Sequence, residues 1–441
     1  MLSFDSDAAL TYKGKANQMN IFEISAVLIG LSALFGYINH RFLRLPHTIG
    51  LVMIALAASL SIIAIEALSP TTQIASLVTD MLNQIDFHEA VMNGMLSFLL
   101  FAGALHVDFS VFKSNSSAIA LMATLGILLS TFLIGGATWW LLNQFGIDMP
   151  FMWALVFGSL ISPTDPVAIL GLFKTVNVPN TLEAKMAGES LFNDGVGVVV
   201  FAVVVAIAVG DGSHGDMSAL TIVQLFLTEA VGGALLGLLA GYIGYRAMHG
   251  IDEHNLEVLI TLAMVMVTYV VALQLHMSGP ISMVVAGLFI GNQGMKFAVS
   301  DNTKDYIRKF WSLLDEILNS VLFLLIGLEV LIIGQSADHV DVALLIIPIT
   351  IIARWFAVFV PIMILSRWRT FTKGAIPILT WGGLRGGIAV ALALSLPVNE
   401  YKPTILSITY AVVLFSIIVQ GLTIKPLVER AVSKNIVVDT E

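Results

Sequence analysis

The sequence Ser162-Pro163-Thr164-Asp165-Pro166 interrupts an apolar run, residues 151–173, that is long enough to cross a lipid bilayer. Each proline lacks the N–H that closes a helical turn, and each disfavours helical geometry in the residue before it. Irregular backbone at membrane depth is tolerated only where protein buries it or water reaches it. Its freed carbonyl and hydroxyl oxygens suit a small, hard cation. The stretch therefore predicts a broken helix that offers oxygen ligands to a cation, with a plain proline kink as the alternative.

The composition places the whole chain in a membrane. Its 441 residues include only 21 Lys+Arg and 30 Asp+Glu, so that 12% are charged while 57% are hydrophobic. A soluble domain carries about 25% charged residues. The net charge of −9 leaves no basic stripe for nucleic acid, and the absence of cysteine excludes disulfides, thiolate metal sites and cysteine nucleophiles. We expect an all-α polytopic membrane protein.

About thirteen apolar runs approach the length of about 20 residues that a membrane helix needs. They cover 21–39, 46–68, 88–107, 117–142, 151–173, 181–210, 219–248, 256–275, 279–293, 310–334, 341–366, 374–397 and 403–428. The ninth is short enough to be tilted or re-entrant. We predict a single transmembrane unit over 21–428, preceded by a short extracytoplasmic segment, 1–20, that does not read as a signal peptide, and followed by a short cytoplasmic tail, 429–441.

The distribution of Lys and Arg predicts the orientation, because positive residues are retained on the cytoplasmic side. With the N-terminus outside, only Lys13, Lys15 and Lys402 among the basic loop residues lie on the extracytoplasmic side. We therefore expect an extracytoplasmic N-terminus and a cytoplasmic C-terminus.

A second polar stretch, Gly188-Glu189-Ser190-Leu191-Phe192-Asn193-Asp194-Gly195, lies within the run 181–210. On a helix Ser190 and Asp194 share a face one turn apart, whereas Glu189 and Asp194 point about 140° apart. One carboxylate can therefore form a structural ion pair while the other meets a transported ion. Burial favours the neutral form of a carboxyl group, so that a proton can compete for it. The alternative is that both carboxylates are paired for structure.

The third stretch is Trp381-Gly382-Gly383-Leu384-Arg385-Gly386-Gly387, in the twelfth run. Its glycines permit unwinding and close backbone approach, with small-residue helix packing as the alternative. The fifth and twelfth runs cross the membrane in opposite directions, and two broken helices in oppositely oriented halves are typical of inverted-repeat secondary transporters. Arg385 can neutralise helix C-terminal ends that meet at the midplane. Arg354, inside the eleventh run, also needs a partner.

Together these motifs resemble the NhaP-like and NHE-like branch of the monovalent cation/proton antiporters. The resemblance rests on SPTDP followed by GESLFNDGVG (188–197), then an arginine in a late helix, Arg354, and GGLRGG (382–387) in the next helix. The motifs LLFAGALHVD (99–108) and LNSVLFLLIGLE (318–329) extend it over essentially the whole membrane region.

The resemblance implies a bacterial inner-membrane antiporter, not an enzyme, that exchanges Na⁺ or Li⁺ for H⁺ in pH homeostasis without a cofactor. It further implies a homodimer in which helices within 117–210 and 341–428 form a mobile core that moves against a dimerisation domain formed by the rest.

The resemblance also implies roles for individual residues. Asp194 would bind a proton and Na⁺ alternately, with Na⁺ held at Asp194, Ser190 and Thr164. Asp165 would line the same site. Asn193 fills the place where electrogenic relatives carry a second aspartate, which favours electroneutral one-for-one exchange. Supporting roles would fall to a Glu189–Arg354 pair and to Arg385 at the crossing of the broken helices.

Some features depart from the family or leave alternatives open. Phe101 is followed by Ala102, where some relatives carry a glutamate, and the long regulatory tail of eukaryotic exchangers is not expected. A K⁺/H⁺ antiporter of the same fold remains the alternative, with a cation channel disfavoured because four-fold filter sequences are missing. An intramembrane protease is disfavoured because the histidines lie mostly in loops or near the ends of runs. The sequence assigns no role to Glu229 or Glu329.

Overall fold

The computed structural model describes residues 20–69, 74–82, 84–165, 180–210, 219–333, 340–368, 371 and 374–436. Within these ranges the chain is helical, and its only β-type pairing is an isolated bridge between Asp165 and Leu384. The part of the predicted run 151–173 that follows Asp165, including Pro166, lies outside the described residues, as does nearly all of the predicted segment 1–20.

Eight helices of the described chain are long and apolar enough to cross a membrane. They are Phe22–Leu43, His47–Leu68, Phe112–Gln144, Leu182–Gly210, Val223–Met248, His254–Gln274, Asp341–Leu365 and Lys402–Ala431. Two shorter apolar helices cover Glu89–Leu105 and Phe151–Ile161. Further helical segments are α14 (Gly279–Phe289), α16 (Asp301–Leu328), α19 (Ala375–Trp381) and α20 (Gly387–Leu394).

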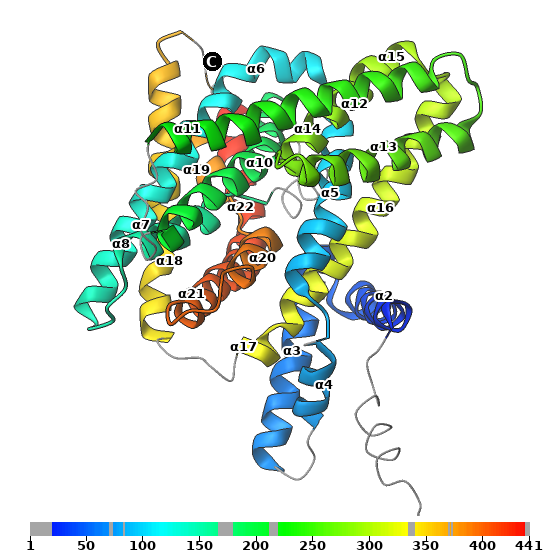
Figure 1. Cartoon of the computed structure of the whole chain (residues 1–441). Coiled ribbons are helices and arrows are strands. Elements are labelled where there is room, and N and C mark those ends of the chain that lie inside the picture. The colour runs from blue at the N-terminus through cyan, green and yellow to red at the C-terminus, as the bar shows by residue number, and fades with distance from the viewer. Residues whose placement is uncertain are drawn as a thin grey trace, which may run out of the picture.

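The helices form two neighbouring sets (Figure 1). In the first, α16 packs against α3 (His47–Leu68) and α5 (Leu96–Leu105), and α14 packs between α5 and α12 (Gly233–Met248). In the second, α8 (Phe151–Ile161) packs against α7 (Ile127–Gln144) and α10 (Asn180–Gly210), while α18 (Val340–Leu365) packs against α7 and α21 (Lys402–Phe415). Helices α19 and α20 join this second set by packing against α18 and α21, respectively, so that the set carries the three polar stretches singled out in the sequence.

Glycine allows the closest helix approaches. A Cβ on Gly158 of α8 would lie 2.3 Å from the carbonyl oxygen of Thr131 in α7, and one on Gly237 of α12 would lie 2.3 Å from that of Ser282 in α14. Lipid cannot drive helices together by a hydrophobic effect, so that close packing through small residues is a main source of association.

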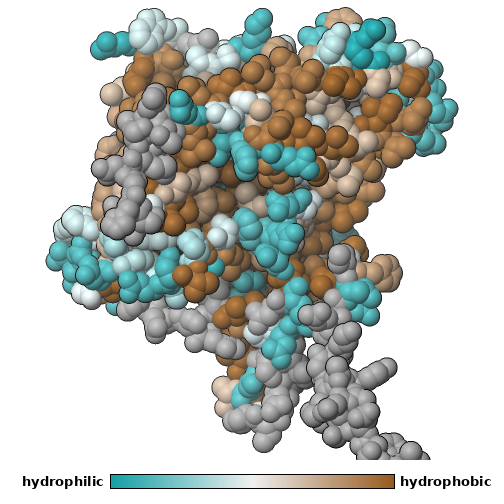
Figure 2. Space-filling view, in the orientation of Figure 1, coloured by the Kyte–Doolittle hydropathy of each residue, from teal (hydrophilic) through white to brown (hydrophobic). Residues whose placement is uncertain are grey.

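Much of the visible surface is apolar, as a lipid-facing surface requires. Figure 2 shows hydrophobic side chains over much of the upper part of the face, with hydrophilic ones along its upper edge, through its middle and at its lower left. Large exposed side chains include Phe132, Leu235, Val267, Leu344 and Ile352, each more than half exposed. Such an extensive apolar surface marks a membrane interaction.

Several helices extend beyond their predicted runs. For example, α16 begins at Asp301, before the predicted start at 310, and α22 (Gly421–Ile436) continues into the predicted tail. Ser300 caps α16 by accepting a hydrogen bond from the Thr303 N–H at 3.4 Å. A search for apolar residues detects only the part of a helix that lies in lipid, and it misses such polar ends.

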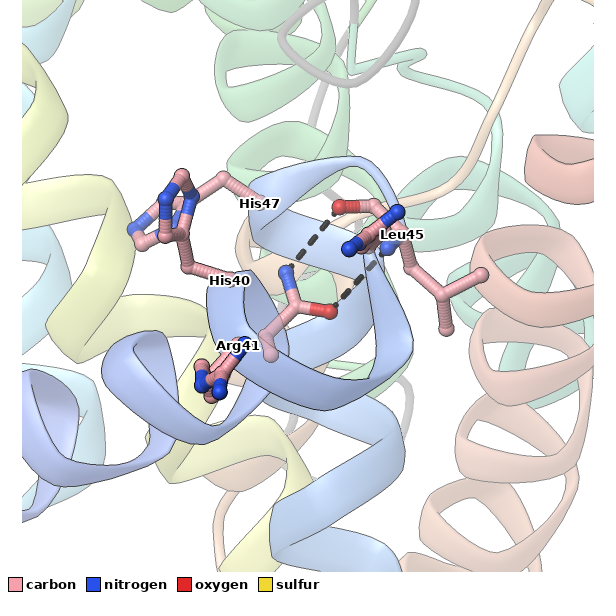
Figure 3. A pocket seen from close by; sticks show the side chains of 6 residues that line it. His40, Arg41, Leu45 and His47 are labelled. Atoms are coloured by element: carbon pink, nitrogen blue, oxygen red, sulfur yellow. Dashed lines mark hydrogen bonds between the residues drawn. The ribbon is translucent and has the colours of Figure 1, made fainter.

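The turn between α2 (Ile21–Ile38) and α3 holds a basic cavity (Figure 3). The Asn39 amide fixes this turn, because its Nδ2 donates to the Leu45 carbonyl at 3.0 Å and its Oδ1 accepts from the Leu45 N–H at 3.2 Å. The cavity is lined by Asn39, His40, Arg41, Arg44, Leu45 and His47. None of the predicted ion-site residues lines it.

Candidate ion site

The first interruption follows α8. The helix ends at Ile161, and the Ser162 hydroxyl donates back to the Gly158 carbonyl at 2.6 Å and lies 3.2 Å from the Thr131 hydroxyl. From Pro163 onward the backbone leaves the helix, as expected where a proline removes a donor and disfavours helical geometry in its neighbour. Ser162 and Thr164 are buried, so that this irregular backbone is enclosed by protein.

The second interruption separates α19 from α20 and lies directly against the first. The Asp165 N–H donates to the Leu384 carbonyl at 2.7 Å. Gly386 has no side chain to keep Asp165 away: a Cβ there would lie 2.1 Å from Asp165 Oδ2. Likewise, a Cβ on Gly383 would lie 2.5 Å from the Arg354 Nε. These two glycines are therefore required by close approach to charged groups.

Arg385 connects the two interruptions. Its Nη1 donates to the carbonyl oxygens of Ser162 and Pro163, the latter at 2.9 Å. These are carbonyls that a regular helix would satisfy internally. The side chain is only 3% exposed, so that its charge is balanced by the backbone dipoles that it contacts.

A hydroxyl and amide cluster joins the first interruption to α10. The Asn193 Nδ2 donates to the Thr164 Oγ1 at 2.8 Å, and the Asn193 Oδ1 accepts from the Thr164 N–H at 3.3 Å. The hydroxyls of Thr164 and Ser190 lie 3.2 Å apart. All three side chains are buried. They form a polar wall made of neutral oxygen and nitrogen groups.

Asp194 lies one helical turn after Ser190 in α10 and is 6% exposed. Asp165 lies at the first interruption, where it is half-buried and its N–H contacts the second interruption. A buried carboxylate such as that of Asp194 favours the binding of a proton or a cation, because burial disfavours its bare charge. Together with Thr164 and Ser190 they supply hard oxygen ligands of the kind that alkali cations prefer.

The Glu189 side chain, on the same helix α10, points away from Asp194 and toward α18. Both of its carboxylate oxygens accept from the Arg354 guanidinium, which approaches from α18, with Nη2 to Oε2 at 3.0 Å. The Nε and Nη2 of Arg354 also donate to the Leu379 carbonyl of α19, at 3.3 and 3.1 Å. One arginine thus ties α10, α18 and α19 together.

The site contains polar residues that the sequence reasoning did not single out. The Arg385 N–H donates to the Ser416 hydroxyl at 2.9 Å, and the Gln420 Nε2 donates to the Trp381 carbonyl at 3.3 Å. Ser416 and Gln420 are a polar pair four residues apart inside the apolar run 403–428. That spacing was the available signal, since it places both side chains on one helix face.

Glu229 and Glu329, to which the sequence assigned no role, belong to other helical segments. The Glu229 carbonyl accepts from the Ser278 N–H at 3.1 Å, which joins the π-helical turn η4 (Thr228–Gly232) to α14. Glu329, at the end of α16, is 5% exposed. Within the described ranges there is no group of three or more His, Asp or Glu side chains arranged to hold a metal ion.

The long apolar helices and the buried charged groups are those of a polytopic ion transporter. Residues 30–430 match the family model described as the transmembrane sodium/hydrogen exchanger. The chain is 46% identical over 415 residues to the Na⁺/H⁺ antiporter NhaP of Pseudomonas aeruginosa, covering 93% of this chain and 97% of that protein. It is 33% identical to the Na⁺/H⁺ antiporter NhaH of Halobacillus aidingensis, over 88% of this chain and 93% of that one.

The fold has a solved counterpart. The structure of the sodium proton antiporter MjNhaP1 from Methanocaldococcus jannaschii at pH 8 superimposes with a TM-score of 0.71 at 20% identity, covering 96% of this chain and 98% of that one. The chain belongs to the sodium/hydrogen exchanger family. The family resemblance drawn from the motifs is confirmed, and with it the expectation of a membrane antiporter in place of an enzyme.

Proposed function

We propose that this antiporter exchanges Na⁺ for H⁺ by competition at Asp194. The observation that carries the proposal is the contact between the Thr164 and Ser190 hydroxyls beside the crossing of the two interruptions, with Asp165 at that crossing and Asp194 one turn after Ser190 on α10. A proton and a dehydrated Na⁺ cannot both occupy one carboxylate, so each displaces the other. A bare carboxylate is costly in low dielectric, so that the empty site crosses the membrane rarely. Exchange then follows without ATP.

The proposed ligands differ in charge, and each kind has its own role. Asp194 supplies the charge that changes, and the hydroxyls of Ser190 and Thr164 supply neutral oxygens that replace water around Na⁺. Asp165 lowers the electrostatic potential of the site, which favours cation entry. Asn193 orients Thr164 through two hydrogen bonds and carries no charge. With one exchangeable carboxylate on this part of α10, the proposed stoichiometry is one Na⁺ for one H⁺, which is electroneutral.

The proposed architecture has about thirteen transmembrane helices, with the fifth and twelfth interrupted and crossing. The bridge from Asp165 to Leu384 and the contacts of Arg385 with Ser162 and Pro163 support that crossing. We place the N-terminus outside, the C-terminus in the cytoplasm and the protein in a bacterial inner membrane. Helices within 117–210 and 341–428 are the proposed mobile core, and the rest form the scaffold of a homodimer.

The decisive experiment uses proteoliposomes with an internal pH dye. Addition of Na⁺ to wild-type vesicles should release protons from the lumen, and Asp194→Asn should abolish this response because amide oxygen neither titrates nor carries charge. Arg41→Ala, an exposed change at the basic cavity, is the matched control for a substitution outside the site. Wild-type exchange by Asp194→Asn would refute the assignment.

The same vesicles separate the alternatives. Exchange with K⁺ in place of Na⁺ would identify a K⁺/H⁺ antiporter, and Li⁺ tests the smaller cation. Net cation flux without counter-transport would identify a channel. An imposed membrane potential should leave the rate unchanged if one Na⁺ exchanges for one H⁺, whereas a change in rate with voltage would contradict electroneutral exchange.

A further inference from the structure

The second interruption leaves backbone groups that no regular helix can satisfy. Between Trp381 and Arg385 the chain runs through a tight turn, in which the Leu384 N–H donates to the Gly382 carbonyl at 2.9 Å. The Arg385 N–H and the Trp381 carbonyl then point away from helical partners. In a buried region each would cost free energy if it stayed unpaired. Both find their partners on one turn of the last helical run.

That turn is η7 (Ser416–Gln420), a π-helical turn between α21 and α22. Its Gly421 N–H donates to the Ser416 carbonyl, five residues earlier. Such wide turns occur mostly as single insertions in α-helices, frequently at functional sites. The Ser416 hydroxyl donates to the Gln420 Oε1 at 2.6 Å.

The hydrogen bonds form one directed chain. The Arg385 N–H donates to the Ser416 hydroxyl, the hydroxyl donates to the Gln420 Oε1, and the Gln420 Nε2 donates to the Trp381 carbonyl. Ser416 is 1% exposed and Gln420 is 5% exposed, so that water does not compete for these groups. The direction of every hydrogen bond is determined, because the chain starts at a backbone donor and ends at a backbone acceptor.

The residues held by this chain of hydrogen bonds are the ones that contact the first interruption. Leu384 accepts from the Asp165 N–H, and the Arg385 side chain donates to the Ser162 and Pro163 carbonyls. We propose that Ser416 and Gln420 are positioning residues, which hold the second interruption at the distance from Thr164 and Asp165 that cation binding needs. This inference rests on the proposed function of the site. A displacement well below 1 Å is enough to weaken a preorganised site.

The test compares Ser416→Ala with Thr409→Val. Thr409 is a buried hydroxyl of α21 in the same run, and within the part of the chain that the structure describes its Oγ1 has no hydrogen-bond partner. Ser416→Ala should raise the apparent KM for Na⁺ about 3- to 10-fold, as expected for one lost buried hydrogen bond, and shift the pH profile of exchange. Ser416→Thr, which keeps the hydroxyl, should restore both. Thr409→Val should resemble the wild type.

Hydrogen–deuterium exchange provides a readout that does not depend on transport. Peptides that cover 382–386 should exchange faster in Ser416→Ala and in Gln420→Met than in Thr409→Val. If Ser416→Ala has the KM for Na⁺, the pH profile and the deuterium exchange of the wild type, the inference is overturned even if thermal stability falls. If Ser416→Ala does not accumulate in the membrane, Gln420→Met decides on the same criteria. A failure of the ion-site proposal would appear instead as wild-type transport by Asp194→Asn.

Discussion

Arg354→Ala tests whether the ion pair between α10 and α18 holds this half of the protein together. In the structure Arg354 uses both ends of its guanidinium, donating to the two oxygens of Glu189 and to the Leu379 carbonyl. The Glu189 side chain is 1% exposed, and that of Arg354 is 7% exposed. Alanine would leave the Glu189 carboxylate in low dielectric without its hydrogen-bonded counter-charge.

The expected loss is roughly 3–5 kcal/mol, the cost of removing one partner from a buried ion pair. Such a loss is a large part of the stability of most proteins. Replacing both partners with uncharged residues, as in Glu189→Gln with Arg354→Met, should recover most of it, because no unpaired charge then remains. A double-mutant cycle therefore isolates the pair from the simple loss of side-chain volume.

The assay is the apparent melting temperature in detergent, together with the fraction of monodisperse protein after size-exclusion chromatography. Arg41→Ala serves as the matched control, because it also removes an arginine but from an exposed position. It should change stability by less than about 0.5 kcal/mol. An Arg354→Ala protein with the melting temperature and exchange rate of the wild type would refute the reasoning.

Two further predictions concern the broken helix and its end. Gly386→Ala should strongly reduce Na⁺/H⁺ exchange, since its Cβ would lie 2.1 Å from Asp165 Oδ2 and would push the interruptions apart. Gly136→Ala is its control, because nothing lies within 4 Å of the Cβ added there. Equal exchange rates in the two variants would contradict the close-approach argument. Lys402→Met should loosen the end of α20, because Lys402 Nζ donates to the Leu394 and Leu396 carbonyls at 2.7 and 2.6 Å. We expect a loss of about 1–3 kcal/mol and faster deuterium exchange over 390–397, and unchanged exchange there would count against a capping role.

The structure gives a reason for the position of Lys402, which is an exception in the charge distribution of the sequence. The sequence identified it as one of the few basic residues on the predicted extracytoplasmic side, an exception to the charge bias. Its two hydrogen bonds to carbonyls at the end of α20 give a local reason for a cation at that position, because helix C-termini attract positive charge.

The sequence by itself determined the membrane class, the family, the apolar runs and the residues at the first interruption. Apolar length and proline chemistry act locally, so that neighbouring residues carry this information. The direction of Glu189 away from Asp194 also followed from the helical period alone. The polar start of α16 and the polar end of α22 were missed because they lie outside the apolar pattern.

Only the tertiary structure decided what satisfies the groups freed by the interruptions. The sequence indicated that prolines would free carbonyls near Ser162, that the glycines around Gly382 permit unwinding, and that Arg385 could stabilise the crossing. It did not indicate which carbonyls Arg385 contacts, or that Ser416 and Gln420 pair with the Arg385 N–H and the Trp381 carbonyl. These pairings join segments far apart in the chain. An unpaired polar group in low dielectric is costly, so that each freed carbonyl or N–H must have a partner. Which residue becomes that partner depends on how the helices pack.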